Sequence, residues 1–172
     1  LWNDPSFMLM MCQNVRISLK EYVENNYLRK EIDKNYETLK ITVSELDANI
    51  RLAVENAPYK TIVTSNSAYK FLEKYGVKVY LVNDDTSSKD LSEIDTLIKQ
   101  GKITKIFNYE EDKTTANVQN IINKYPNTVS FASFKHMNLL TEEARKNKSD
   151  YVTLMNQNLD TLKEELYHGT ND

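Results

Sequence analysis

The hydrophobic period of this chain changes at residue 60, and that change constrains the fold more than any other feature. The segment that follows is KTIVTSNSAYKFLEKYGVKVYLV, from Lys60 to Val82. Thr61 to Thr64 is short and β-branched, Ala68 to Lys74 has helical spacing that ends at Tyr75-Gly76, and Lys78 to Val82 is apolar. This order predicts a strand, a polar turn, a helix and a second strand.

The same alternation continues downstream. A helix is expected from Asp90 to Lys99, a strand from Lys105 to Asn108, a helix from Thr115 to Lys124 and a strand from Thr128 to Phe131. Strands separated by helices at this spacing predict right-handed crossover connections and a parallel sheet.

Helical patterns flank this region on both sides. Asp4 and Pro5 suit the cap and first position of a helix. Apolar residues then recur every three or four positions in two stripes, which break at Asn25-Asn26 and end at Ala57-Pro58: Met8, Met11, Val15, Leu19 and Tyr22, then Leu28, Ile32, Tyr36, Leu39, Val43, Leu46, Ile50 and Val54. Mixed charges between them favour a packed helix pair over a membrane or partner surface. A last helix is expected from about Ser149 to Tyr167.

The predicted fold class is therefore α/β: a four-stranded parallel sheet with crossover helices, preceded by a long helical hairpin and closed by a C-terminal helix. Residues 1–58 would form the hairpin, 59–147 the α/β lobe, and 148–172 the terminal helix and tail. A chain of 172 residues can bury one core of this size without disulfides or metal.

Composition excludes several classes of function. The net charge of −3 argues against a nucleic-acid partner. The longest apolar run, Phe7 to Cys12, is far shorter than the ~20 residues that span a bilayer. Cys12 is the single cysteine, so no internal disulfide forms, and we expect a buried helix thiol.

The polar turn after the first predicted strand is the natural place for a ligand, because ligands gather at the carboxyl ends of strands in open α/β sheets. This turn offers only Ser65, Asn66 and Ser67. The chain also lacks a G-x-S-x-G sequence, a glycine-rich phosphate loop, an H-E-x-x-H sequence and a CxxC sequence. We therefore expect no enzyme activity.

Four segments resemble the zinc- or manganese-binding solute-binding lipoproteins of bacterial ABC transporters, a family that includes adhesins. LWNDP at the start resembles the W-x-DP entry into the long interdomain helix of that family. KTIVTSNSAYKFLEKYGV resembles the strand, ligand turn and helix that begin the second lobe. ITKIFNYEED resembles the third strand with its acidic loop, and YVTLMNQNLDTLKEEL resembles the closing helix.

The resemblance implies that the chain is the connecting helix plus the second lobe, with the signal sequence, lipid-anchored cysteine and first lobe upstream. In the family, a metal ion lies between two lobes. Two histidines of the first lobe bind it, together with a His or Glu after the first strand of the second lobe and an Asp after its fourth strand. The last two positions fall on Asn66 and Ser133 of this sequence.

These two residues depart from the family pattern. Zinc prefers imidazole, thiolate or carboxylate ligands, and manganese prefers hard oxygens with negative charge. Because Asn66 and Ser133 carry no charge, we expect a degenerate metal site. Several residues that follow predicted strands are candidate replacement ligands, although such residues are more often solvated: His136, Glu110, Glu111, Asp112, Asp84 and Asp85. We expect His168, in the tail, to be exposed.

Three functional hypotheses remain open. The first is the second lobe of an extracytoplasmic, lipid-anchored solute-binding protein that delivers its ligand to an ABC permease, with Zn or Mn bound in the full-length protein. The second is a surface adhesin-like or scaffold lipoprotein that kept the fold, lost the ion and contacts a host or surface protein. The third is a cytoplasmic α/β enzyme that only resembles the family. In the first two, the membrane is contacted only through an anchor upstream of this chain.

Overall fold

The computed structural model describes residues 3–109, 112–137 and 141–170, and it contains the predicted parallel sheet. The four strands are β1 (Thr61–Thr64), β2 (Lys78–Leu81), β3 (Lys105–Asn108) and β4 (Ser130–Ser133), in the spatial order β2-β1-β3-β4. All three neighbouring pairs are parallel. The predicted fold class is confirmed.

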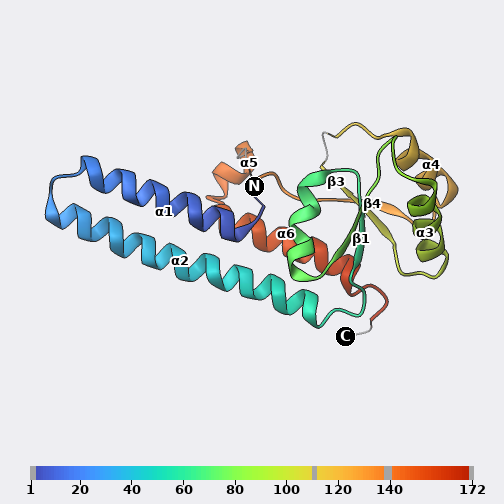
Figure 1. Cartoon of the computed structure of the whole chain (residues 1–172), viewed down its shortest axis with the longest axis horizontal. Helices are drawn as coiled ribbons and strands as arrows, with labels where there is room; N and C mark the ends of the chain where they lie inside the picture. Colours follow the sequence, from blue (N-terminus) through green and yellow to red (C-terminus); the bar gives the residue numbers. More distant parts are fainter. Residues whose placement is uncertain (1–2, 110–111, 138–140, 171–172) are drawn as a thin grey trace.

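Helices cover both faces of this sheet. The helices α3 (Ser88–Lys99) and α4 (Ala116–Lys124) lie on one face, while α2 (Asn26–Glu55), η1 (Ser67–Tyr75) and α6 (Tyr151–Leu166) lie on the other (Figure 1). Alternate strand residues point into the two layers, as the period of two in a strand requires. For example, Ile62 contacts the α2 and α6 side, and its neighbour Val63 contacts the α3 and α4 side.

A helical hairpin extends from the lobe. It consists of α1 (Pro5–Tyr22) and α2, and Figure 1 shows it reaching well beyond the sheet. Asp4 caps α1 by accepting a hydrogen bond from the Ser6 N–H group, and Asn25 caps α2. A short helix, α5 (Glu142–Lys146), precedes α6.

The two halves of α2 have different surroundings. In the C-terminal half, Val43, Leu46, Ile50 and Val54 are buried. In the N-terminal half, Leu28 and Leu39 are exposed. The predicted pairing of the two helices is confirmed, but only part of the apolar stripe of α2 is covered. Cys12 is half-buried rather than buried, so that prediction was wrong: its part of α1 faces the uncovered half of α2.

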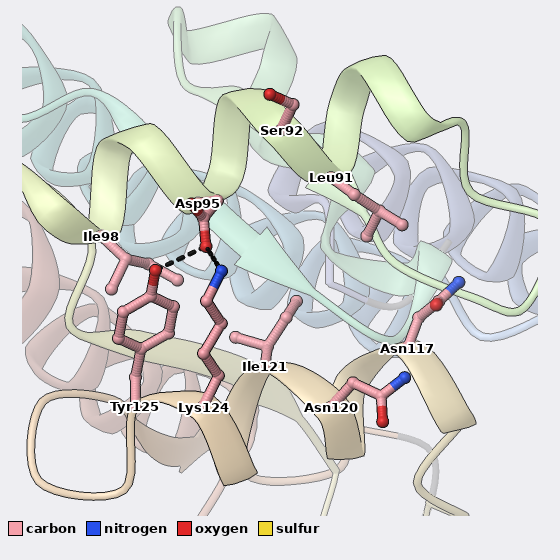
Figure 2. A pocket seen from close by; sticks show the side chains of 9 residues that line it. All are labelled: Leu91, Ser92, Asp95, Ile98, Asn117, Asn120, Ile121, Lys124 and Tyr125. Atoms are coloured by element: carbon pink, nitrogen blue, oxygen red, sulfur yellow. Dashed lines mark hydrogen bonds and ion pairs between the residues drawn. The ribbon is translucent and has the colours of Figure 1, made fainter.

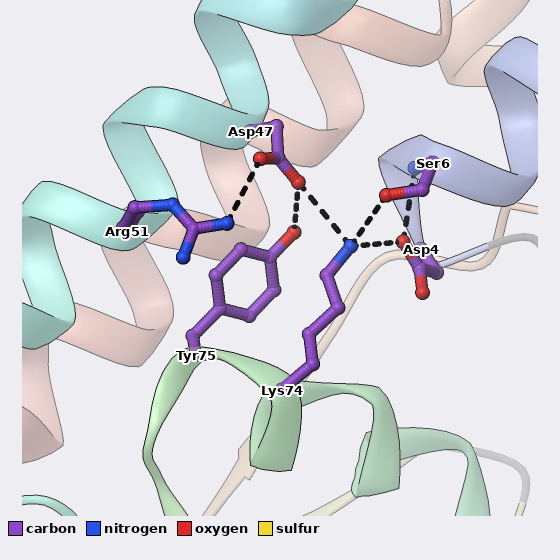
Figure 3. A network of polar contacts seen from close by, with 6 residues as sticks. All are labelled: Asp4, Ser6, Asp47, Arg51, Lys74 and Tyr75. Carbon is purple, nitrogen blue, oxygen red and sulfur yellow. Dashed lines mark hydrogen bonds and ion pairs between the residues drawn. The ribbon is translucent and has the colours of Figure 1, made fainter.

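A polar network fastens the hairpin to the lobe (Figure 3). Lys74 of η1 donates to the carboxylates of Asp4, at 2.5 Å, and Asp47, at 3.2 Å. The Tyr75 hydroxyl donates to the same Asp47 oxygen at 2.7 Å. Arg51 lies 3.5 Å from the other Asp47 oxygen. The start of α1, the C-terminal half of α2 and the end of η1 therefore meet at one point.

The helix after β1 is of the 3-10 type, a detail that the sequence pattern did not specify. Residues three apart lie on one face of a 3-10 helix. Tyr69, Leu72 and Tyr75 have this spacing, and all three are buried. Gly76 ends the helix with a φ of 97°, a left-handed conformation that favours glycine.

The fourth strand begins two residues later than predicted. The Thr128 and Val129 N–H groups both donate to the Tyr125 carbonyl, at 3.1 and 3.0 Å, in the turn that closes α4. Sheet pairing starts only at Ser130, whose N–H group donates to the Thr104 carbonyl. Ser133 is consequently the last residue of β4, in register with Asn108 of β3.

Candidate functional site at the carboxyl ends of the strands

The carboxyl ends of β1, β3 and β4 are adjacent, because these strands are neighbours in the sheet. Asn66 lies two residues after β1, Asn108 ends β3 and Ser133 ends β4. The two positions that the family resemblance implies, 66 and 133, are thus at the same edge of the sheet. Each of them makes hydrogen bonds with a residue of the β3 end or its loop.

Both ends of the Asn66 side chain have partners. Its Oδ1 accepts a hydrogen bond from the Ala68 N–H group at 2.8 Å, which caps η1. Its Nδ2 donates to Oδ2 of Asp112 at 3.0 Å. The backbone N–H of Asn66 donates to the Thr64 hydroxyl at 3.0 Å. Asn66 therefore joins the turn after β1 to the loop after β3.

Ser133 makes the corresponding link between β3 and β4. Its hydroxyl donates to Oδ1 of Asn108 at 2.8 Å. This bond follows from the strand register, since residues paired across parallel strands place their side chains on the same face. Ser133 is therefore bound to a neutral amide.

The buried side chain of Tyr69 makes two hydrogen bonds at this edge of the sheet. This side chain is fully buried, and its hydroxyl donates to the Asn108 carbonyl at 2.6 Å and accepts from the Phe134 N–H group at 3.0 Å. Burial raises the pKa of the Tyr69 hydroxyl far above its ordinary value. Tyr69 is thus a neutral hydroxyl that fixes the ends of β3 and β4 relative to η1.

His136 lies three residues beyond Ser133 and does not point freely into solvent. Its ring stacks on Tyr109, with centroids 4.3 Å apart and an interplanar angle of 21°. Its Nε2 is buried, with no hydrogen-bond partner among the described residues. The Tyr109 hydroxyl accepts from Nδ2 of Asn3 at 2.6 Å, and burial raises the pKa of this tyrosine.

Asp84, another candidate ligand, binds a helix terminus instead. Oδ1 of Asp84 accepts a hydrogen bond from the Ala116 N–H group at 3.0 Å, so this carboxylate binds the N-terminus of α4. Negative charge is favourable at such a helix end. Glu110 lies outside the described residues.

The donor set at positions 66 and 133 does not fit a zinc or manganese ion. An amide and a hydroxyl supply no charge and no imidazole, and both are engaged in hydrogen bonds. Within the described ranges, no three His, Cys, Asp or Glu side chains gather in a group that could hold a metal ion.

Sequence reasoning did not single out Asn108, Tyr69 or Asn3 as parts of this edge. Asn108 carried one signal, its place at the end of a predicted strand. Tyr69 and Asn3 act through partners 39 to 106 positions away in the sequence. Such contacts have no local pattern.

Away from this edge, a cleft of about 380 Å³ lies between α3 and α4 (Figure 2). Asp95 is its main charged group, and its carboxylate accepts from Lys124 and Tyr125, both at 2.5 Å, and pairs with Lys99 at 2.7 Å. The Lys124 hydrogen bond, with those from Lys99 and Tyr125, lowers the pKa of Asp95 well below its usual range. The carboxylate is therefore neutralised locally.

Comparison with known proteins supplies the family. The sequence model of the ZnuA family, described as zinc-uptake complex component A, periplasmic, matches residues 1–165, almost the whole chain. The chain belongs to the ZnuA family.

Relatives of this ZnuA-family chain are longer than the chain itself. It is 28% identical over 170 residues to the zinc-binding protein AdcA of Streptococcus pyogenes serotype M6, covering 95% of this chain and 32% of that protein. It is 25% identical over 171 residues to the zinc-binding lipoprotein AdcA of Streptococcus pneumoniae strain R6, covering 95% and 33%. The chain thus spans about one third of the length of these curated relatives.

Solved structures share the fold of this ZnuA-family chain. The metal-dependent lipoprotein YcdH of Bacillus subtilis superimposes with a TM-score of 0.73 at 20% identity, over 96% of this chain and 63% of that one. The Zn(II)-bound ZnuA-like domain of S. pneumoniae AdcA has a TM-score of 0.69 at 23% identity, over 96% and 62%. The laminin-binding protein Lmb of Streptococcus agalactiae has a TM-score of 0.74 at 17% identity, over 96% and 63%.

In the part of the ZnuA-family chain that the structure describes, no helix combines the length and apolarity needed to cross a bilayer.

Proposed function

We propose that the chain is the C-terminal lobe, with its connecting helices, of an extracytoplasmic metal-type ABC transporter solute-binding lipoprotein whose metal site is degenerate. Membership of the ZnuA family supports the transport class. The zinc-binding names of the AdcA relatives support zinc as the ion that the site once held. No catalytic role is assigned to any residue.

One observation carries the degenerate-site part of the proposal. Asn66 and Ser133 are neutral, and both are bound to side chains of the β3 end and its loop rather than presented together to a ligand. A zinc site requires deprotonated or imidazole ligands, which bring charge or strong basicity. Neither residue offers either property.

The surface of the hairpin supports the assignment to one lobe of a larger protein. A mainly apolar groove of about 300 Å³ runs between α1 and α2, lined by Cys12, Val15, Leu19, Ile32 and Leu39 among others. Val15 is 58% exposed and Leu19 47% exposed. The groove continues the stripe of α2 that is buried against the sheet, so a second body on the same side would cover it. We propose three segments in this lobe: the hairpin at 1–58, the α/β region at 59–147, and the terminal helix and tail at 148–172.

In this proposal the full-length protein is held outside the membrane by a lipid anchor and docks on an ABC permease. Both features come from the family, and one relative is the zinc-binding lipoprotein AdcA of S. pneumoniae. The solute passes from the receptor to the permease, so weak metal binding at this lobe would mean weak metal transport.

The second candidate function is a surface adhesin-like or scaffold lipoprotein that has kept the fold and no longer binds metal. One comparison favours it specifically: Lmb is described as a bifunctional protein with adhesin and metal-transporting activity. A lobe that retains the scaffold and loses the ion could serve the first of those activities alone.

Elemental analysis of the purified full-length protein tests the proposal. We expect much less than one zinc or manganese per molecule after dialysis against metal-free buffer, with an AdcA relative purified in parallel as the loaded control. One tightly held metal per molecule would contradict the degenerate site.

A further inference from the structure

Asp112 is the only charged side chain among the hydrogen-bonded partners described for Asn66. Its Oδ2 accepts two hydrogen bonds, from Nδ2 of Asn66 and from the Tyr109 N–H group, both at 3.0 Å. The Asp112 N–H group in turn donates to the Tyr109 carbonyl at 2.9 Å. This local ring holds the carboxylate in a fixed place beside residue 66.

A carboxylate in such a place has a known use in metal sites. A histidine that binds a metal through one ring nitrogen usually donates the N–H of its other nitrogen to a carboxylate, a carbonyl or water. That hydrogen bond fixes the tautomer and the ring orientation. Asn66 makes the same kind of bond with its amide, although the amide itself does not suit zinc.

We propose that Asp112 is the positioning residue for side chain 66, retained after the ligand at that position was lost. This inference rests on the proposed function, because it takes residue 66 as a former ligand position. The β1 end and the loop after β3 therefore keep a site's orienting group without its ligand. In this proposal the chain departs from the family at the ligand side chain itself and keeps the carboxylate that orients it.

The geometry predicts which ring nitrogen of a histidine at position 66 would carry the proton. The Nδ1 of histidine and the Nδ2 of asparagine are the same number of bonds from the backbone. In the Asn66→His variant, Nδ1 would occupy the place of the amide nitrogen and donate its N–H to Asp112. The ring would then carry its proton on Nδ1 and leave the lone pair of Nε2 free.

Nuclear magnetic resonance of the imidazole nitrogens tests this in the chain without any metal. At about pH 8.5, where an ordinary imidazole is neutral, Asn66→His is expected to populate mainly the Nδ1–H tautomer. Adding Asp112→Ala should shift the ring to the Nε2–H form. Adding Asp84→Ala instead, which removes another loop carboxylate that binds Ala116, should change nothing.

A second variant covers the case in which Asp112→Ala does not fold. Asp112→Asn keeps an oxygen for the Tyr109 N–H group and removes only the charge, and it should lower the Nδ1–H population. The inference would be overturned if the imidazole ring at position 66 were mainly in the Nε2–H form. It would also be overturned if neither Asp112 substitution changed the tautomer population.

Zinc binding by the full-length protein separates this inference from the proposed function. With Asn66→His and Ser133→Asp in place, removing the Asp112 carboxylate should weaken zinc binding about 10- to 100-fold. Restored zinc binding that is indifferent to Asp112 would overturn the inference and leave the former ligand positions supported. No restoration at all, with the tautomer still set by Asp112, would count against the proposed function and not against the orienting contact.

Discussion

Tyr69 is the residue on which the geometry of the site edge depends most directly. Its hydroxyl bonds one backbone group of β3 and one immediately after β4, and its ring packs against Phe107, Tyr109 and Phe134. No polar ligand is needed to hold these strands together. Hydrogen bonds and ring contacts within the protein therefore link the ends of β3 and β4 at this edge.

Tyr69→Phe should lower the free energy of unfolding by about 1–3 kcal/mol, because a buried Phe134 N–H group loses its partner. Urea unfolding measures the loss. Tyr27→Phe, at a tyrosine that is 68% exposed, is the matched control and should change stability by less than about 0.5 kcal/mol. Equal effects of the two substitutions would contradict the supporting role of Tyr69.

The sequence indicated which residues lie at the site, but it did not indicate which residues they bond to. Asn66 and Ser133 were placed by resemblance, and they follow β1 and end β4, the two strands on either side of β3, at the same edge of the sheet. The hydrogen bond from Asn66 to Asp112 joins residues 46 positions apart, so a local sequence pattern could not predict it. The prediction that His168 is exposed was wrong, because its ring stacks on Tyr59 at 4.3 Å.

At the scale of elements, the junction of α1, α2 and η1 depends on the charge of Asp47 (Figure 3). Burial acts to raise the pKa of this carboxyl, but hydrogen bonds from Tyr75 and Lys74 outweigh it, so the pKa lies below its ordinary value. A carboxyl with a lowered folded-state pKa stabilises the fold above its unfolded pKa of about 3.9. That stabilisation is lost as the pH falls through the lower folded value.

Asp47→Asn should therefore lower the melting temperature at pH 7, and the difference from the native chain should shrink as the pH falls below about 4. Thermal unfolding followed by circular dichroism from pH 7 to pH 2.5 measures it. Asp160→Asn is the control, because that side chain is 77% exposed and lies 3.9 Å from Lys163. A deficit that stays constant with pH would show that the charge of Asp47 does not matter.

The type and order of the strands and of the longer helices were predictable, but the short helix α5 was not expected and element boundaries were less predictable. The changes of hydrophobic period located all four strands, but the turn after α4 used Thr128 and Val129 and delayed β4. The 3-10 form of η1 is set by the burial of Tyr69, Leu72 and Tyr75 against the lobe. The delay of β4 comes from local backbone hydrogen bonds in the turn after α4, whereas the form of η1 reflects tertiary packing, which overrides local propensity.

At the scale of the whole molecule, the hairpin leaves the apolar groove between α1 and α2 exposed. Its groove residues Leu19 of α1 and Leu39 of α2 are 47% and 38% exposed, although Leu39 continues a stripe that is buried farther along α2. In the proposed function, another part of the full-length protein covers them. Lysine at either position should then affect the isolated chain and the full-length protein differently.

Leu19→Lys and Leu39→Lys should leave the melting temperature of this chain nearly unchanged and lower that of the full-length protein, since apolar burial would be lost only there. Differential scanning calorimetry of both proteins compares the effects. Ile41→Lys is the control, because Ile41 is 60% exposed and is not among the residues that line the groove. Equal effects in the two proteins would contradict coverage of the groove.

The central claim is that positions 66 and 133 are former ligand positions that no longer hold an ion. Calorimetric titration of zinc into the metal-free full-length protein, native and with Asn66→His plus Ser133→Asp, tests it most directly. We predict weak or undetectable binding to the native protein and one strong site in the double variant. Tight binding to the native protein, or no gain in the double variant, would contradict the account.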